Sequence, residues 1–498
     1  MADEHPNTGR REGLRGRHHF LIVAYGIQSH VNPARALAHR LTRLAADADA
    51  DAGGSIVATI SLPVHAHRRV FPSPDDGADA EEAATDGVVS YVPHSDGVDD
   101  GSIPWDDDER ARRRRAASDS LAAVVARLAA RGRPVTCVVC TMVLPVALDV
   151  AREHGLPLAV CWIQPAIVLA ACYHYFHGYG ELVASLAGGD PSCAVSLPGL
   201  SRPLRVRDFP SFLVDTTGSV VTKVVNDAFR ELFEYMDQWR STTKVLVNTF
   251  DELEPTVLAE MKRHLDVFAI GPIVGSSTTE ARIHLFKHDD DDKRRYMAWL
   301  GDQPEKSVVY VSFGSISKHS KRQMEEIVQG LRRCGRPYLL VVRKDGLDGL
   351  DVEGASDCLE IVVQGQGIVV EWCNQLEVLS DPAVGCFVTH CGWNSTLEAL
   401  VSGVPIVAVP NMFDQPTNAY LVEEEWVIGI KGERNSEGIL TGMELARCIE
   451  LVMGEEGTKS VQIRERARAL KRIAQDAIHA GGPAERNIKD FVQTIQTL

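Results

Sequence analysis

The sequence predicts an α/β protein made of two domains, each built around a parallel sheet with helices on both faces. At 498 residues the chain is too long for one ordinary hydrophobic core, so two domains are expected. Short apolar runs of strand length alternate with amphipathic helical segments in both halves, which is the pattern of a doubly wound sheet. Between the halves, a Gly/Pro/Ser-rich strand end runs into a charged stretch, and we interpret residues 268–298 as the interdomain linker.

The composition excludes several classes of protein and partner. Apolar residues make up 45% of the chain and charged residues 24%, which is typical of soluble globular proteins. A formal net charge of −16 argues against a surface for nucleic acid. No apolar run reaches the length of a membrane-spanning helix, and the scattered cysteines fit a reducing compartment. We therefore expect a cytoplasmic protein without membrane insertion.

Neither the cysteines nor the acidic clusters predict a metal site. Cys137 and Cys140 form a C-x2-C pair, but the pair lies inside an apolar run and no second pair follows, so we interpret both as core residues. The acidic clusters at 95–101 and 105–109 could be taken for an Asp-x-Asp metal clamp, yet neither follows a strong strand. We expect solvated loops there.

The predicted domains lie on either side of the linker. Residues 1–19 are polar and mixed in charge, and we expect them to be a disordered lead. The first domain is predicted to cover residues 20–267 and the second residues 299–475. Residues 476–498 contain a last, capped amphipathic helix.

The first strand and helix of the chain frame a histidine. The continuous apolar run from Phe20 to Tyr25 indicates a buried parallel strand. Asn32 and Pro33 are typical of a helix start, so His30 is expected in the loop between strand and helix. A single histidine in a loop is usually a solvated side chain, and by itself His30 is weak evidence of function.

The alternation continues through the rest of the first domain. Strand-like runs occur at 55–65, 134–145 and 156–166, with an amphipathic helix at 119–132. The segment 162–180 carries aromatic residues and histidines at near-helical spacing, which predicts core packing and one amphipathic helix.

Residues 307–315 restart the pattern as the first strand of the second domain. The strand ends in Gly314 and Ser315. Glycine permits a close approach of the backbone to a ligand, and the serine hydroxyl can donate to a phosphate. One such turn is weak evidence until a second phosphate-binding feature faces it.

The stretch from Trp372 to Gln415 is the most informative part of the chain. The apolar strand 385–390 ends on His390, and small polar residues that open a helix follow at once. A helix start of this kind presents unpaired N–H groups and the positive end of the helix dipole, which predicts an anion site. A second strand then leads to Asp414 and Gln415, at the edge where open α/β sheets bind ligands.

This stretch resembles the signature box of the plant UDP-dependent glycosyltransferases, glycosyltransferase family 1. One departure is Asp381, where that family usually has His. The resemblance implies the GT-B fold, with two facing Rossmann-like domains, a deep cleft between them and a last helix that crosses back onto the first domain. The gapless match includes Trp372, Gln375, Leu379, Gly385, Phe387, His390, Gly392, Trp393, Asn394, Ser395, Glu398, Gly403, Val404, Pro405, Pro410, Asp414 and Gln415.

The resemblance also implies a reaction and a donor site. The reaction is inverting transfer of glucose from UDP-α-glucose to a hydroxyl or carboxylate of a small lipophilic acceptor, by a monomer that needs no metal ion or other cofactor. Trp393, together with Gln415 rather than His at the end of the box, favours glucose over galactose. The implied contacts are Ser315, His390, Asn394 and Ser395 on the phosphates, Trp372 and the Cys373 backbone on uracil, Gln375 and Glu398 on the ribose, and Trp393, Asp414 and Gln415 on the sugar hydroxyls.

On the acceptor side, the resemblance makes His30 the catalytic base. The family carries its base in a Gly-His-x-Asn-Pro pattern, in which this chain has Ser29 in place of Gly. Thr141 stands where many relatives have an Asp that orients this histidine. An Asp stabilises the imidazolium, whereas Thr can only hydrogen-bond. This substitution and the neighbouring motifs resemble the subgroup with anthocyanin 5-O-glucosyltransferases and enzymes that make glucose esters of plant acids.

The missing Asp leads to a hypothesis about the acceptor. A phenol, with a pKa of about 10, needs a base during attack, whereas a carboxylic acid is already ionised at pH 7. We therefore expect carboxylates or acidic phenols such as flavonoid hydroxyls, with Tyr173, Phe176 and Tyr179 as candidates to line the acceptor pocket. A catalytically weak UDP-sugar-binding protein stays open as an alternative. A Rossmann oxidoreductase does not fit, because the Gly-x-Gly-x-x-Gly turn is missing from the sequence.

Overall fold

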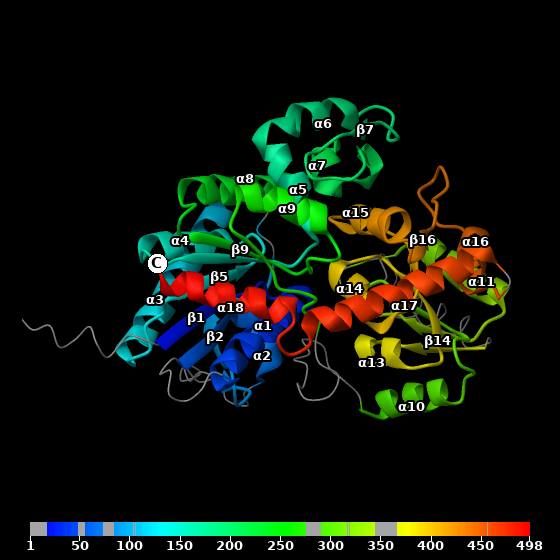
Figure 1. Ribbon diagram of the computed structural model, residues 1–498, viewed down its shortest axis with the longest axis horizontal. Helices are drawn as coiled ribbons and strands as arrows, with labels where there is room; N and C mark the ends of the chain where they lie inside the picture. The colour runs from blue at the N-terminus through cyan, green and yellow to red at the C-terminus, as the bar shows by residue number, and fades with distance from the viewer. Residues whose placement is uncertain are drawn as a thin grey trace, which may run out of the picture.

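Two sheets of parallel strands lie side by side, each surrounded by helices (Figure 1). This arrangement confirms the predicted fold class of two Rossmann-like α/β domains. The structure is a computed structural model that describes residues 17–47, 55–72, 84–274, 290–343 and 366–498, except for residues 103, 105, 316, 318 and 456.

The first sheet belongs to the first domain. Within the described residues its strand order is β10-β9-β6-β5-β1-β2-β4-β3, and each strand runs parallel to its neighbours except β3, which pairs antiparallel with β4. The strands are β1 Arg17–Val23, β2 Ser55–Pro63, β3 Ala84–Thr85, β4 Ser90–His94, β5 Cys137–Thr141, β6 Leu158–Trp162, β9 Thr243–Val247 and β10 Val267–Ala269. A separate antiparallel pair consists of β7 Ala194–Val195 and β8 Leu204–Arg205.

The second sheet has the order β13-β12-β11-β14-β15-β16 in the described part of the chain, with all pairs parallel. Its central strands are β11 and β14, whose C-terminal ends lead into the two phosphate-binding turns that the sequence predicts. The strands are β11 Val308–Ser312, β12 Tyr338–Val341, β13 Gly367–Val370, β14 Val384–Thr389, β15 Ile406–Ala408 and β16 Gly429–Lys431.

Helices connect the strands in both domains. In the first domain they are α1 Gln28–Asp47, α2 Val64–Val70, α3 Asp107–Ala130, α4 Pro145–Glu153, α5 Ala166–His174, α6 Gly180–Ala187, α7 Ser211–Val214, α8 Val220–Gln238 and α9 Pro255–His264. In the second part of the chain they are α10 Asp290–Gly301, α11 Lys321–Cys334, α13 Gln375–Ser380, α14 Trp393–Ser402, α15 Gln415–Tyr420, α16 Gly442–Met453, α17 Thr458–Ile478 and α18 Pro483–Gln496. No helix among the described residues combines the length and apolar character needed to cross a membrane.

The central strands of both sheets are largely apolar because helices cover both faces of each sheet. Every residue of β5 and β14 is buried, which explains the continuous apolar runs in the sequence. Cys137 and Cys140 lie in β5 with no exposed surface, so they are core residues, as predicted.

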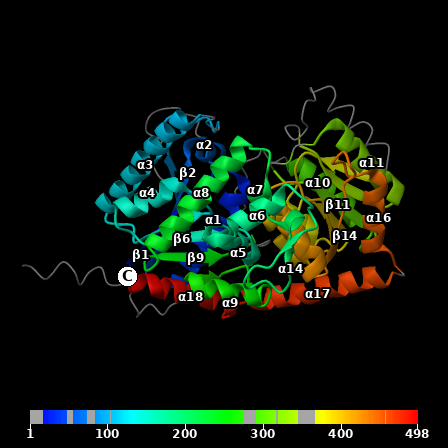
Figure 2. The same cartoon turned by 90° about the horizontal axis from the view of Figure 1, so that it is seen from above.

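The last two helices run along one side of the molecule and span both domains (Figure 2). α17 packs against the second domain and α18 against the first sheet. The Phe491 ring of α18 lies 5.8 Å from the rings of both Phe20 and Phe268. Asn487 donates a hydrogen bond to the carbonyl of Ala269 at 2.8 Å. The chain therefore returns to the first domain at its end.

Several element bounds differ from the predicted boundaries. β1 starts at Arg17, inside the predicted disordered lead, and residues 1–16 lie outside the described residues. β10 ends at Ala269, inside the predicted linker, and residues 275–289 of that linker lie outside the described residues. α17 extends to Ile478, past the predicted domain end at residue 475. These differences arise because a strand or helix continues through polar residues when tertiary packing supports it.

Candidate active site

The C-terminal edges of the two sheets meet at the start of α14. The indole N–H of Trp393 donates to the carbonyl of Asn248, the residue that follows β9, at 2.8 Å. The side chain of Asn394 donates to the carbonyl of Ser29, which follows β1, at 2.9 Å. The helix start that the sequence predicts as an anion site therefore lies directly against the turn that carries His30.

Helix α1 begins earlier than predicted. It starts at Gln28, so His30 lies in its first turn rather than in a loop, and Pro33 lies inside the helix. Proline has no N–H, so the carbonyl of Ser29, four residues earlier, lacks its usual helical donor. Asn394 of the second domain supplies a donor to that carbonyl. The helix can contain this proline because the unpaired carbonyl is satisfied from the other domain.

His30 and Thr141 are in contact. Nδ1 of His30 lies 3.1 Å from Oγ1 of Thr141, the last residue of β5, which is fully buried. Burial lowers the pKa of His30 to about 4, because a low-dielectric surrounding disfavours the imidazolium. The Thr141 hydroxyl carries no charge that could reverse this shift. At neutral pH His30 is therefore uncharged, and it is a weaker base than an ordinary histidine.

The ring of His390 is held between two glycines. A Cβ atom on Gly314 would lie 2.6 Å from Cε1 of His390, and one on Gly392 would lie 2.5 Å from Nε2. Gly314 also has a φ of +78°, in the left-handed region. Burial lowers the pKa of His390 to about 4, so the ring is neutral at pH 7. A neutral imidazole can still donate one N–H to a phosphate oxygen.

Ser315 follows Gly314 in the turn after β11. Its carbonyl accepts a hydrogen bond from Arg343, which follows β12, so the turn is tied to the neighbouring strand. Because β11 and β14 are neighbours in the sheet, this turn and the start of α14 lie at the same edge. The two predicted phosphate-binding features are thus brought together.

Three residues that are predicted to contact the donor form a hydrogen-bonded group between α13 and α14. Nε2 of Gln375 donates to Glu398 Oε2 at 2.7 Å and to Ser395 Oγ at 2.9 Å. Glu398 and Ser395 are nearly buried on one face of α14. The predicted ribose contacts Gln375 and Glu398 are therefore neighbours, and Ser395 links them to the predicted phosphate contacts.

Trp372 and Cys373 lie just after β13, next to this group. The Cys373 thiol is within 3.2 Å of the Tyr310 hydroxyl, and burial raises its pKa to about 12. The thiol is thus part of the core, which leaves only the backbone of Cys373 to meet a base edge. That is the role predicted for it.

The indole of Trp393 does not fit the sugar contact expected from sequence. Trp393 is only 3% exposed, and its N–H already donates to the carbonyl of Asn248. Its side-chain donor therefore holds the two domains together. A contact from Trp393 to a sugar would have to come from its backbone N–H, which lies in the first turn of α14 and has no partner within the helix.

Asp414 and Gln415 lie at the start of α15. The Asp414 carboxylate accepts a hydrogen bond from Nδ2 of Asn418 at 2.7 Å, and burial raises the pKa of Asp414 to about 6. Oε1 of Gln415 accepts from the backbone N–H groups of Asn411 and Met412 at 2.9 and 3.0 Å. The amide carbonyl of Gln415 therefore closes the turn, and Nε2 is the end that can donate to a ligand.

The aromatic candidates for the acceptor pocket pack against other aromatic rings. Tyr173 stacks on His177 with ring centroids 3.9 Å apart, and it also contacts His264 at the end of α9. The Phe176 ring packs at 5.7 Å from Phe233 of α8. Their role in acceptor binding stays a prediction.

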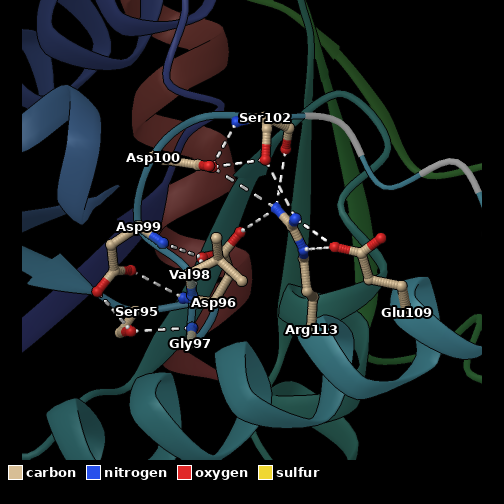
Figure 3. Close-up of polar contacts among 9 residues, drawn as sticks. All are labelled: Ser95, Asp96, Gly97, Val98, Asp99, Asp100, Ser102, Glu109 and Arg113. Atoms are coloured by element: carbon tan, nitrogen blue, oxygen red, sulfur yellow. Dashed lines mark hydrogen bonds and ion pairs between the residues drawn. The ribbon is translucent and has the colours of Figure 1, made fainter.

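The acidic loop at 95–101 has its carboxylates engaged (Figure 3). Arg113 of α3 lies 3.6 Å from Asp96 and 3.8 Å from Asp100. Asp96 and Asp99 accept hydrogen bonds from backbone N–H groups of the same loop. Among the residues that the structure describes, no three His, Cys, Asp or Glu side chains are grouped so that they could hold a metal ion.

Sequence reasoning missed four residues that shape this site. Asn248 and Asn418 hold Trp393 and Asp414 by the hydrogen bonds described above. Asn248 ends the apolar run 244–248, and a polar residue at such a strand end is a signal that could have found it. The others, Asp208 and Ser211, lie in an irregular segment, where the sequence shows no pattern that points to the second domain.

Comparison with known proteins agrees with this arrangement. A family model described as "UDP-glucoronosyl and UDP-glucosyl transferase" matches residues 216–475. Phloretin 4'-O-glucosyltransferase of Malus domestica is 38% identical over 502 aligned positions, which cover 97% of this chain and 98% of the relative. Anthocyanidin 3-O-glucoside 5-O-glucosyltransferase of Verbena hybrida is 39% identical over 496 positions, which cover 96% and 99%.

A solved structure shows the same architecture. Os79 from O. sativa, in complex with UDP, matches with a TM-score of 0.74 and 29% identity, over 96% of this chain and 100% of that chain. The family model covers more than half of the chain, and the relatives match nearly all of it. The predicted family is thereby confirmed: this chain belongs to the UDP-dependent glycosyltransferases of glycosyltransferase family 1, with the GT-B fold, and it is a UDP-glycosyltransferase.

Proposed function

We propose that this enzyme transfers glucose from UDP-α-glucose to a small lipophilic plant metabolite and inverts the anomeric carbon. The acceptor atom is a carboxylate oxygen or the oxygen of an acidic phenol. The observation that carries this choice is that His30 contacts the uncharged Thr141 hydroxyl rather than a carboxylate at that position, while burial lowers the pKa of His30 to about 4. Phenolic acceptors are also supported by the names of the relatives that act on phloretin and on anthocyanidin glucosides.

On the donor side, the residues at the start of α14 receive the charge of the departing diphosphate. The first-turn N–H groups of α14, together with His390, Asn394 and Ser395, follow the C-terminal end of β14, and Ser315 follows the neighbouring strand β11. Donors fixed before the reaction can stabilise developing negative charge without a metal ion. Asp414 and Nε2 of Gln415 then hold hydroxyls of the glucose.

On the acceptor side, one tautomer of His30 can act as a base. If Nδ1–H donates to Thr141 Oγ1, the lone pair on Nε2 is available to take a proton from the acceptor. The pKa of protonated His30 is about 4, whereas the pKa of a phenol is about 10. Proton transfer from a phenol to His30 is therefore strongly unfavourable. An acceptor that is already ionised avoids this step.

A direct assay tests the proposal and the need for metal together. The enzyme is incubated with UDP-glucose, excess EDTA and a panel of phenols and carboxylic acids, and added hexose is detected by mass. We expect products from carboxylic acids and acidic phenols at a rate that EDTA does not change. A rate that falls with EDTA and recovers with Mg²⁺ would contradict a metal-free reaction.

The second candidate, a UDP-sugar-binding protein with weak catalysis, is favoured by the same low pKa of His30. The panel assay separates the two candidates. UDP-glucose binding without product from any acceptor would support the binding protein and contradict the transferase. We also propose a cytoplasmic monomer, which the free cysteines of the described residues fit.

Thr141→Asp is expected to move the acidic limb of the pH profile of kcat/KM to higher pH. In the native enzyme His30 is deprotonated above about pH 5, so kcat/KM for a phenol should show no decline between pH 7 and 5 from this group. A carboxylate at position 141 favours the imidazolium and raises the pKa of His30. The acidic limb of the pH profile then moves toward neutrality, and the rate with phenols at pH 7 rises by about tenfold.

Thr141→Val is the matched control, because it keeps the shape of the side chain and removes only the hydroxyl. We expect it to lower the rate of glucose transfer to phenols without moving the acidic limb of the pH profile to higher pH. If Thr141→Asp left the pH profile of the native enzyme unchanged, residue 141 would not control the protonation of His30.

A further inference from the structure

Residues 205–211 of the first domain hold the turn that precedes Asp414. Ser211, the first residue of α7, binds Phe413 of the second domain through its backbone N–H and its hydroxyl. Its backbone N–H donates to the Phe413 carbonyl at 2.8 Å, and its Oγ accepts from the Phe413 N–H at 2.8 Å. Both polar groups of the Phe413 backbone are thus bound by one residue of the other domain.

Asp208, three residues before Ser211, anchors this segment. Asp208 is 1% exposed, and its carboxylate lies between Arg205 Nε at 2.6 Å and Lys431 Nζ at 3.0 Å. Its backbone carbonyl accepts from the Thr417 hydroxyl at 2.7 Å. Lys431 and Thr417 belong to the second domain and follow the turn in the chain, so Asp208 fixes the segment to that domain at two further points.

Phe413 needs this support because of its backbone conformation. Its φ is +58°, in the left-handed region that side chains other than glycine rarely adopt. Gln415 closes the inside of the turn through the N–H groups of Asn411 and Met412, but it does not bind Phe413. The peptide groups of Phe413 are left to Ser211, and Asp414 is the next residue.

The geometry points to Ser211 as a positioning residue for recognition of the transferred sugar. Ser211 keeps Phe413 in its left-handed conformation, and this conformation aims Asp414 and Gln415 at the glucose. The inference rests on the proposed function, in which these two residues hold sugar hydroxyls. The uracil, ribose and phosphates of UDP are assigned to other segments, so a change at Ser211 should weaken binding of the sugar and spare the nucleotide.

The test compares the affinities of UDP and UDP-glucose by calorimetry. In Ser211→Ala, the Phe413 N–H loses its acceptor and the turn can relax. We expect the Kd of UDP-glucose to rise by about five- to tenfold while the Kd of UDP stays within about twofold of the native value. In steady-state kinetics the KM for UDP-glucose should rise and the KM for the acceptor should not.

Two variants serve as controls. Ser211→Thr keeps the hydroxyl and should restore the native affinity for UDP-glucose. Ser201→Ala removes another serine that bonds across the domains, to the exposed carboxylate of Glu425, and should change neither affinity. An equal loss of UDP and UDP-glucose affinity in Ser211→Ala, or no loss of either, would overturn the inference. Failure of the proposed function would instead appear as absence of transfer by the native enzyme.

Discussion

His30→Ala is expected to lower kcat/KM for phenolic acceptors by about 10²- to 10⁴-fold and for carboxylic acids by less than about tenfold. The difference arises because a phenol must lose its proton during attack, whereas a carboxylic acid has lost it before binding. His30, which contacts Thr141, is the proposed base, and removal of its imidazole removes the proposed proton acceptor. The measurement is a pair of initial-rate series at pH 7 with saturating UDP-glucose.

The exposed His154 at the end of α4 provides the control. His154→Ala should leave both series unchanged, and circular dichroism should show that both variants are folded. An equal loss for phenols and carboxylic acids in His30→Ala would show that the ring acts by some route other than proton removal, and the acceptor hypothesis would fail.

Gly314→Ala is expected to weaken binding of UDP by about ten- to hundredfold. The added Cβ would lie 2.6 Å from Cε1 of His390. Gly392 also packs closely against the Cε1–Nε2 edge of this ring, so the ring has little free space in which to move. His390 and the first turn of α14 must therefore shift, and the donors aimed at the diphosphate lose their alignment. Calorimetry with UDP measures the effect.

Gly335→Ala separates this collision from the cost of the left-handed backbone. Gly335 ends α11 in the same domain with a φ of +63°, and a Cβ there meets nothing within 4 Å. Both variants should lose about 1 kcal/mol of stability, but only Gly314→Ala should lose affinity for UDP. Native affinity in Gly314→Ala would mean that His390 and the diphosphate site tolerate the displacement.

The fold was largely predictable because each parallel strand is buried on both faces. Such strands are apolar along their length and stand out from the amphipathic helices between them, as in β5 and β14. Element bounds were less predictable. Helix α1 begins earlier than Pro33, where the sequence predicts its start. The hydrogen bond from Asn394 to the carbonyl of Ser29 allows this, and no local sequence pattern indicates it.

All predicted donor contacts except Ser315 lie in the stretch from Trp372 to Gln415, and the structure brings several of them together. Gln375, Ser395 and Glu398 meet because they lie close in sequence on two adjoining helices. The indole of Trp393 is different. It donates a hydrogen bond to Asn248, which lies 145 residues earlier in the chain, and no local sequence pattern predicts this contact.

The fold class and the family could be predicted from the sequence, because they depend on periodicity and on motifs of residues close together in the chain. The sequence also pointed to Thr141 as the residue near His30. Only the tertiary structure decided how the two domains meet. The contacts of Asn394 with Ser29 and of Phe413 with Ser211 join residues 365 and 202 positions apart. Such pairs form only when the two domains pack together, and that packing depends on the shapes of both surfaces at once.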